Sequence, residues 1–223
     1  MIYVQVVNLY RKRGETVKKR FMYIFLIIIM SASYTSCASQ SAQSEMSIRK
    51  AELTEEELRM AQLIGSQSAL SDITGSIFDF SVDESVEKLQ LNTYRLNDGE
   101  WELISGGGGE AVEDTEGRIA LNFGNIGDGM RIAIQSENTS SSTDWKTSEP
   151  QNLDGVSTAT SYLTEVTEIE YEKEIPLVVQ ISTKANSISS YGTGYFYSPE
   201  KYEEQGYENV YAVTVRFSQE KLS

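Results

Sequence analysis

The spacing of apolar residues along the chain changes from helical to alternating at about residue 73. Before that point, residues 53–65 (LTEEELRMAQLIG) carry an apolar stripe at helical spacing, which predicts a short helix. Thr54 suits the N-cap, and Glu57 lies three residues later, which completes a capping box. Because so short a helix is marginal alone, we expect it to dock on the rest of the chain.

From residue 73 onward, short stretches with an apolar residue at every second position predict β-strands. Asn97, Asp98 and Gly99 separate two such stretches and are a strong signal for a two-residue hairpin turn. Pro176 suits the start of an apolar, central strand. Strands are expected within segments 76–83, 88–96, 97–105, 117–123, 129–136, 161–183, 191–198 and 209–218.

About nine or ten short strands without βαβ alternation indicate a mainly β domain. We therefore predict a single antiparallel β-sandwich over residues 53–223, Ig-like or jelly-roll-like, with one short N-terminal helix. Residues 38–52 are small, polar and without period, which predicts a flexible tether. Residues 136–157, with Trp145 in their middle, are predicted to form a long surface loop.

The run SGGGGEA, residues 105–111, resembles part of a dinucleotide-binding glycine loop. That loop requires a helix immediately afterwards, whereas here a strand is expected within a few residues. The run is better explained as a connection in which glycine permits a positive φ.

The N-terminal segment has the pattern of a secretory signal. Its apolar run, residues 21–30, is about half the length of about 20 residues that a membrane-spanning helix needs. Lys18, Lys19 and Arg20 precede the run and small residues follow it. The residues before it add a second basic cluster, so we expect translation to begin near residues 17–22 and the signal to end at residue 37.

Charge and composition exclude several classes of function. The first 37 residues hold six of the 19 basic residues and one of the 33 acidic ones, so the remainder has 13 basic and 32 acidic residues and a formal charge of −19. This balance argues against nucleic-acid binding, which needs clustered Lys and Arg. The chain has no histidine and one cysteine, so Ser-His-Asp triads and Cys/His zinc sites cannot form.

The acidic residues leave two chemistries open. A pair of carboxylates across a cleft could make a glycan-active enzyme, although no local pattern singles out a pair. A calcium-dependent binding domain is the other alternative, because Ca²⁺ takes six to eight oxygen ligands. Calcium is a possible cofactor if two oxygen-rich turns meet at one end of the sandwich, and the candidate ligands are Asp114, Glu116, Asn125 and Asp128. Ordinary turn chemistry explains the same residues.

Aromatic residues are the candidate binding surface. Six tyrosines lie in the last 33 residues. Tyrosine and tryptophan are enriched at interfaces, but they also fill strands and sheet edges. The candidate ligand-binding residues are Trp101, Trp145, Tyr191, Tyr195 and Tyr197, with a glycan or an envelope protein as the expected partner.

The stretch SYTSC, residues 33–37, resembles the lipobox of bacterial lipoproteins. Thr35 and Ser36 match its two small positions and Cys37 its lipidated position, whereas Tyr34 departs from the usual aliphatic residue. The resemblance implies that Cys37 receives diacylglycerol and anchors the chain on the outer face of the cell membrane. Two acyl chains are enough for stable anchoring.

The rest of the chain is similar to small lipoproteins of Gram-positive gut bacteria, over most of residues 53–220. The similarity lies in LISGGGGEAVEDTEGRIALNF, GMRIAIQSEN and YEKEIPLVVQI. This resemblance implies a cell-surface β-domain and transfers no active site to the chain. The expected function is non-catalytic binding or an adaptor role, with the carboxylate enzyme and the calcium-dependent domain as alternatives.

Overall fold

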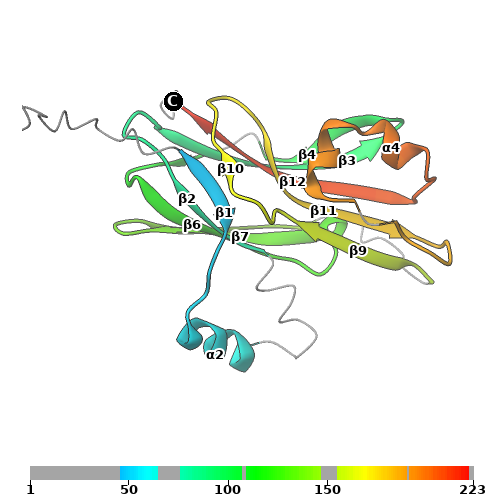
Figure 1. Cartoon of the computed structure of the whole chain (residues 1–223), viewed down its shortest axis with the longest axis horizontal. Helices are drawn as coiled ribbons and strands as arrows, with labels where there is room; N and C mark the ends of the chain where they lie inside the picture. Colours follow the sequence, from blue (N-terminus) through cyan, green and yellow to red (C-terminus); the bar gives the residue numbers. More distant parts are fainter. Residues whose placement is uncertain (1–45, 65–75, 107–108, 147–154, 190, 221–223) are drawn as a thin grey trace, which may run out of the picture. The chain divides into compact units, whose positions relative to one another are not determined.

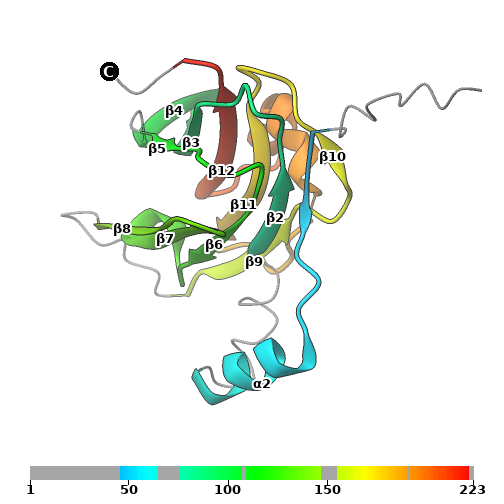
Figure 2. The same ribbon diagram turned by 90° about the vertical axis from the view of Figure 1, so that its left-hand side faces the viewer.

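The computed structural model describes residues 46–64, 76–106, 109–146, 155–189 and 191–220. These residues form two antiparallel β-sheets that pack face to face as a β-sandwich (Figures 1 and 2). Sheet A has the order β10 (Thr167–Glu168), β1 (Ser47–Lys50), β2 (Ile77–Ser81), β6 (Glu116–Asn122), β7 (Gly129–Ser136) and β8 (Ser140–Lys146). Sheet B has the order β4 (Glu100–Ser105), β3 (Lys88–Asn97), β12 (Asn209–Ser218), β11 (Ile175–Thr183) and β9 (Ser157–Tyr162), and β5 (Glu110–Ala111) also pairs with β3.

The alternation in the sequence decides which residues form the core between the sheets. Phe78 and Phe80 on β2 are buried, as are Ile119 and Leu121 on β6. The residues between them point to the opposite face, because side chains alternate along a strand. The prediction of an antiparallel sandwich is confirmed.

A second apolar cluster covers the outer face of sheet B. The 3-10 helix η2 (Thr193–Tyr197) and the helix α4 (Glu200–Glu203) supply Phe196 and Tyr202 to this cluster. Strand β11 is therefore buried along its whole length, since it has a core on each side. This agrees with the prediction of a central strand near Pro176 and explains the near-continuous apolar sequence.

Two predicted local features are confirmed. The helix α2 (Glu55–Ile64) begins with the expected capping box, in which the Thr54 backbone N–H donates to Glu57 at 2.7 Å and the Glu57 N–H donates to the Thr54 hydroxyl at 3.3 Å. Strands β3 and β4 form a hairpin at Asp98 and Gly99, which have φ of 48° and 79°. Positive φ at both positions is typical of the type I′ turn that joins twisted strands.

Gly106 follows β4 and Gly109 precedes β5, two strands that pair with β3 at different positions. Strand β4 pairs with Thr93–Asn97 of β3, and β5 pairs with Lys88 and Leu89 farther along the same edge. Gly106 has a φ of 134°, and a Cβ there would lie 2.9 Å from the carbonyl oxygen of Leu91. Glycine is required at position 106 because of its positive φ and because the Leu91 carbonyl oxygen approaches so closely.

Three predictions about local structure are wrong. Residues 47–50 form β1, with Ile48 fully buried, inside the segment 38–52 that was predicted to be a tether. Strand β8 lies inside the predicted loop 136–157. Residues 193–197 form η2 within a segment that was predicted to be a strand. Strand β1 and η2 are held by pairing or packing with residues distant in sequence, whereas β8 forms a hairpin with the preceding strand β7 in spite of its polar sequence.

Candidate functional site

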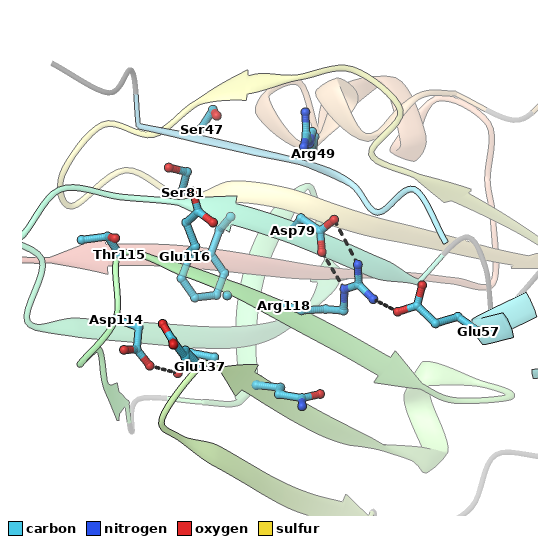
Figure 3. Close-up of a pocket in the computed structure, with 14 residues that line it drawn as sticks. Ser47, Arg49, Glu57, Asp79, Ser81, Asp114, Thr115, Glu116, Arg118 and Glu137 are labelled. Carbon is cyan, nitrogen blue, oxygen red and sulfur yellow. Dashed lines mark hydrogen bonds and ion pairs between the residues drawn. The ribbon is translucent and has the colours of Figure 1, made fainter. Parts of the chain in front are cut away.

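A hollow lies on the outer face of sheet A (Figure 3). It has a volume of about 720 Å³ and is broad and polar. Strands β1, β2, β6 and β7 supply most of its lining, α2 adds Glu57, and the residues next to β6 and β7 add Asp114, Thr115 and Glu137. Four adjacent strands therefore present polar side chains to one ligand-sized surface.

The floor of this hollow is a row of residues that pair across the strands. Arg49 of β1 lies opposite Asp79 of β2, which lies opposite Arg118 of β6, which lies opposite Gln135 of β7. Their neighbours in sequence, such as Phe78 and Ile119, point into the core. The same alternation that builds the core thus places these four side chains on the solvent face.

Arg118 is held in place by two carboxylates. Its Nε donates to Asp79 Oδ1 at 2.6 Å, and its Nη1 donates to Glu57 Oε1 at 2.5 Å (Figure 3). The backbone N–H of Thr54 holds the pKa of Glu57 below its ordinary value, and the Thr54 hydroxyl and Arg118 add to the effect. The capping box therefore fixes both the start of α2 and one wall of the hollow.

Asp114 is fixed at another border of the hollow. It accepts hydrogen bonds from the Ser136 hydroxyl at 2.5 Å, from the Asn138 N–H at 2.9 Å and from the Asn138 side-chain amide at 2.6 Å. The Ser136 hydroxyl, followed by the two Asn138 groups, lowers the pKa of Asp114. A carboxylate with three donors has little remaining capacity to coordinate a metal ion.

Other charged groups of the hollow are available to a ligand. Within the described residues, the side chains of Arg49, Glu116 and Glu137 make no hydrogen bond or ion pair. The lining contains five carboxylates and two guanidinium groups, so it favours neutral or basic ligands over phosphates. Glu57 and Asp114 have lowered pKa values, whereas a general acid for glycoside cleavage needs a raised one.

The structure does not bring the four candidate calcium ligands together. Asp114 and Glu116 lie at the start of β6, and Asn125 and Asp128 lie beyond its end. A strand of this length spans about 20 Å. Asn125 caps the 3-10 helix η1 (Ile126–Asp128) by accepting from the Gly127 N–H. Among the described residues, no group of three or more Asp, Glu, His or Cys is arranged to hold a metal ion.

The candidate aromatic residues are divided between two places. Trp101, Tyr191 and Tyr195 are partly buried in the cluster on the outer face of sheet B. Trp101 stacks on Phe196 with ring centroids 5.0 Å apart and donates from Nε1 to the Phe196 carbonyl at 2.8 Å. These contacts are packing contacts within the chain.

The other two candidates have different surroundings. Tyr197 is 55% exposed, and its hydroxyl donates to the Glu174 carbonyl at 2.6 Å. Trp145 on β8 packs against the core between the sheets. The five residues therefore do not form one platform.

Cys37 lies outside the described residues, as does the whole predicted signal segment. Within the described residues, no helix is long and apolar enough to cross a bilayer.

The site residues that the sequence did not single out are Arg49, Asp79, Arg118 and Gln135. A local signal existed, because Asp79 lies between two buried phenylalanines and Arg118 precedes a buried isoleucine. Such a pattern identifies the outward face of each strand. It does not show that strands 30 or more positions apart are neighbours.

Comparison of the chain with models of protein families, with curated protein sequences and with solved structures finds no match.

Proposed function

We propose that this chain is a lipid-anchored protein on the outer face of the cell membrane, whose sandwich binds a polar ligand without catalysis. The observation that carries the binding proposal is the hollow on sheet A, where four strands present a preorganised row of hydrogen-bonding groups. The lipobox at Cys37 and the basic, apolar segment before it support the location.

An uncharged glycan chain is the ligand that fits this surface best. Its hydroxyl groups can donate to Glu116 and Glu137 and accept from Arg49, whose side chains have no other partner in the described structure. The lining contains more carboxylates than guanidinium groups, which disfavours anionic polymers. Arg118 is already oriented by Asp79 and Glu57, so binding costs little side-chain ordering there.

The ligand is tested with a soluble form from residue 38 onward, which contains the whole compact unit Ser44–Ser223. A glycan array is probed with and without calcium, and a pull-down with envelope proteins runs in parallel. We expect a glycan to bind equally in both calcium conditions. Binding that requires calcium would instead favour the calcium-dependent domain, and an array without any ligand would contradict the glycan proposal.

The position of the site is tested with two charge reversals of the same kind. Glu116→Arg changes the floor of the hollow, and Glu100→Arg changes an exposed residue of β4 in the other sheet. We expect Glu116→Arg to weaken glycan binding at least tenfold and Glu100→Arg to change it less than twofold. Equal effects of the two substitutions would place the ligand elsewhere.

The anchor is tested separately by mass spectrometry of the mature N-terminus of the full chain. The expected species begins with Cys37 and carries diacylglycerol. An unmodified N-terminus after Cys37 would contradict lipidation and would leave the binding proposal unaffected.

A further inference from the structure

A second, apolar cleft lies between the two sheets at the edge formed by β3 and β5 on one side and β7 and β8 on the other. Figure 2 shows these strands at one side of the sandwich, with β5 and β3 above β8 and β7. The cleft has a volume of about 220 Å³. A smaller hollow of about 20 Å³ shares Leu89, Glu110, Ile134 and Ser141 with it and continues it along the edge.

This edge stays open because its inward-facing residues are small. On β8, Ser141 and Thr143 lie opposite Ile134 and Ile132 of β7, at positions where a closed sandwich carries large apolar side chains. On the other side, the lining includes Gly106 and Gly109, which have no side chain. Neither sheet therefore fills the space between them.

The walls of the cleft are apolar. Leu89 and Leu91 come from β3, Ile132 and Ile134 come from β7, and Trp145 comes from β8. Burial of apolar surface drives binding in such a site at about 25 cal/mol per Å². A cleft of about 220 Å³ is smaller than the 300–1,000 Å³ of typical drug-sized sites, so it suits one flexible chain rather than two chains or a fused ring system.

The indole of Trp145 forms part of the apolar wall. Its Nε1 is buried and makes no hydrogen bond in the described structure, so it offers no surface to a ligand in the cleft. The polar groups in the lining are instead the hydroxyls of Ser105, Ser141 and Thr143, and a hydroxyl can donate to the carbonyl oxygen of an ester.

The charges at the cleft select the head group. Among the described residues, the linings of the cleft and its continuation contain the carboxylates of Glu110, Glu113 and Asp114, and no basic residue. These groups repel a fatty-acid anion. An uncharged head group avoids that repulsion and can accept or donate hydrogen bonds at Ser105, Ser141 and Thr143.

We propose that this cleft binds the single acyl chain of an uncharged acyl ester, with the hydroxyls of Ser105, Ser141 and Thr143 as hydrogen-bond partners for the ester group. The proposal does not depend on the hollow on sheet A, because the described lining of the cleft shares no residue with that hollow. Only the smaller continuation shares Phe80, Asp114 and Ser136 with it. The acyl ester could be a free monomer or a component of the bilayer beside the anchored protein.

The test measures by calorimetry the binding of monomeric 1-octanoylglycerol to the soluble form that begins at residue 38. Octanoate at the same concentration and vesicles of phosphatidylcholine with and without monoacylglycerol are the comparison probes. We expect saturable binding of 1-octanoylglycerol and at least tenfold weaker binding of octanoate. Each added methylene should tighten binding by about threefold to fourfold until the cleft is full.

The vesicles distinguish the two sources of the ester. Transfer of monoacylglycerol from vesicles to the protein would assign the ligand to the bilayer, whereas binding of the monomer alone would assign it to the free pool. No saturable binding of the glycerol ester, or equal binding of octanoate, would overturn the proposal.

The position of the acyl-chain site is tested with two matched substitutions on β8. Ser141→Leu fills the cleft, and Ser142→Leu adds the same side chain to the outer face of the same strand. We expect Ser141→Leu to weaken binding of 1-octanoylglycerol at least tenfold and Ser142→Leu to change it less than twofold. Thr143→Leu replaces Ser141→Leu if the latter does not fold, as judged by circular dichroism.

Equal binding of 1-octanoylglycerol by Ser141→Leu and by the original chain would contradict the site.

Discussion

The outer faces of the two sheets are used in opposite ways. The outer face of sheet B is covered by η2 and α4, which pack Phe196 and Tyr202 over the strands. The outer face of sheet A has charged side chains in a row and a hollow above them. The face with the most aromatic residues is therefore a second core, and the face that is open to a ligand is charged.

This difference shows how aromatic content can mislead. Four of the six tyrosines in the last 33 residues lie in the cluster on the outer face of sheet B, namely Tyr191, Tyr195, Tyr202 and Tyr207. Large rings seal a sheet face with few residues. Tyr191, Tyr195 and Tyr202 contact one another with ring centroids 4.6–6.3 Å apart. A surface that recognises an outside ligand would leave such rings unpaired.

The largest expected effect is a loss of folding stability when the aromatic cluster on sheet B is disrupted. Tyr202 is 1% exposed in the second core, so Tyr202→Ala should lower the free energy of unfolding by about 3–5 kcal/mol. Its hydroxyl is buried without a partner in the described structure, so Tyr202→Phe should change the free energy by less than about 1 kcal/mol. Urea denaturation measures both, and a small effect of Tyr202→Ala would show that η2 and α4 do not form a core.

On the outer face of sheet A, loss of a charge should cost less stability. Arg118→Gln should lower the free energy of unfolding by about 1 kcal/mol, because it breaks two ion pairs of partly exposed groups. Arg131→Gln on β7 is the matched control, since its pair with Asp144 is longer, at 3.7 Å, and more exposed. Denaturation curves should show a free energy of unfolding for Arg131→Gln close to that of the original chain. A loss for Arg118→Gln as large as that for Tyr202→Ala would contradict the difference in stability between the two faces.

The sheet B face should be sensitive to alkali. Burial raises the pKa of Tyr94 to about 12, and the nearby Glu174 adds to the effect. A raised folded pKa stabilises the protein fully below the unfolded value of 10.0, and this contribution is lost as the pH rises from 10 to 12. Tyr94→Phe should flatten the decline of stability in this range, as measured by denaturation at several pH values.

The sheet A face should instead respond to acid, with the smallest effect of the four. The lowered pKa values of Glu57 and Asp114 contribute stability above their ordinary values of 4.5 and 3.8. That contribution is lost as the pH falls through the depressed folded values. Asp114→Asn should weaken the loss of folding stability at acid pH and leave the loss at alkaline pH unchanged, as measured by denaturation at several pH values. A change in the alkaline range alone would contradict the assignment of the acid response to the sheet A face.

The sequence predicted the fold class because alternation is strong in its longest strands. Phe78 and Phe80 flank Asp79, and the hairpin signal at Asp98 and Gly99 has few alternatives. Strand β1 was missed because it has one buried apolar residue, Ile48, and is held by pairing with β2 and β10. Strand β8 was missed because its inward positions at the open edge are Ser141 and Thr143.

The candidate site was harder to predict than the fold. Arg49, Asp79 and Arg118 become neighbours only through the order of β1, β2 and β6, which no local pattern encodes. The candidate calcium ligands failed to converge for the same reason, since β6 separates them. Residue type showed which groups could act, and strand order determined which of them meet.

The central claim is that ligands bind the charged face and not the aromatic face. NMR titration of the soluble form with the glycan found on the array tests it most directly. The largest chemical-shift changes are predicted at the backbone amides of Asp79, Glu116 and Arg118, with little change at Trp101 and Tyr195. Changes concentrated at Trp101, Tyr191 and Tyr195 would contradict the claim.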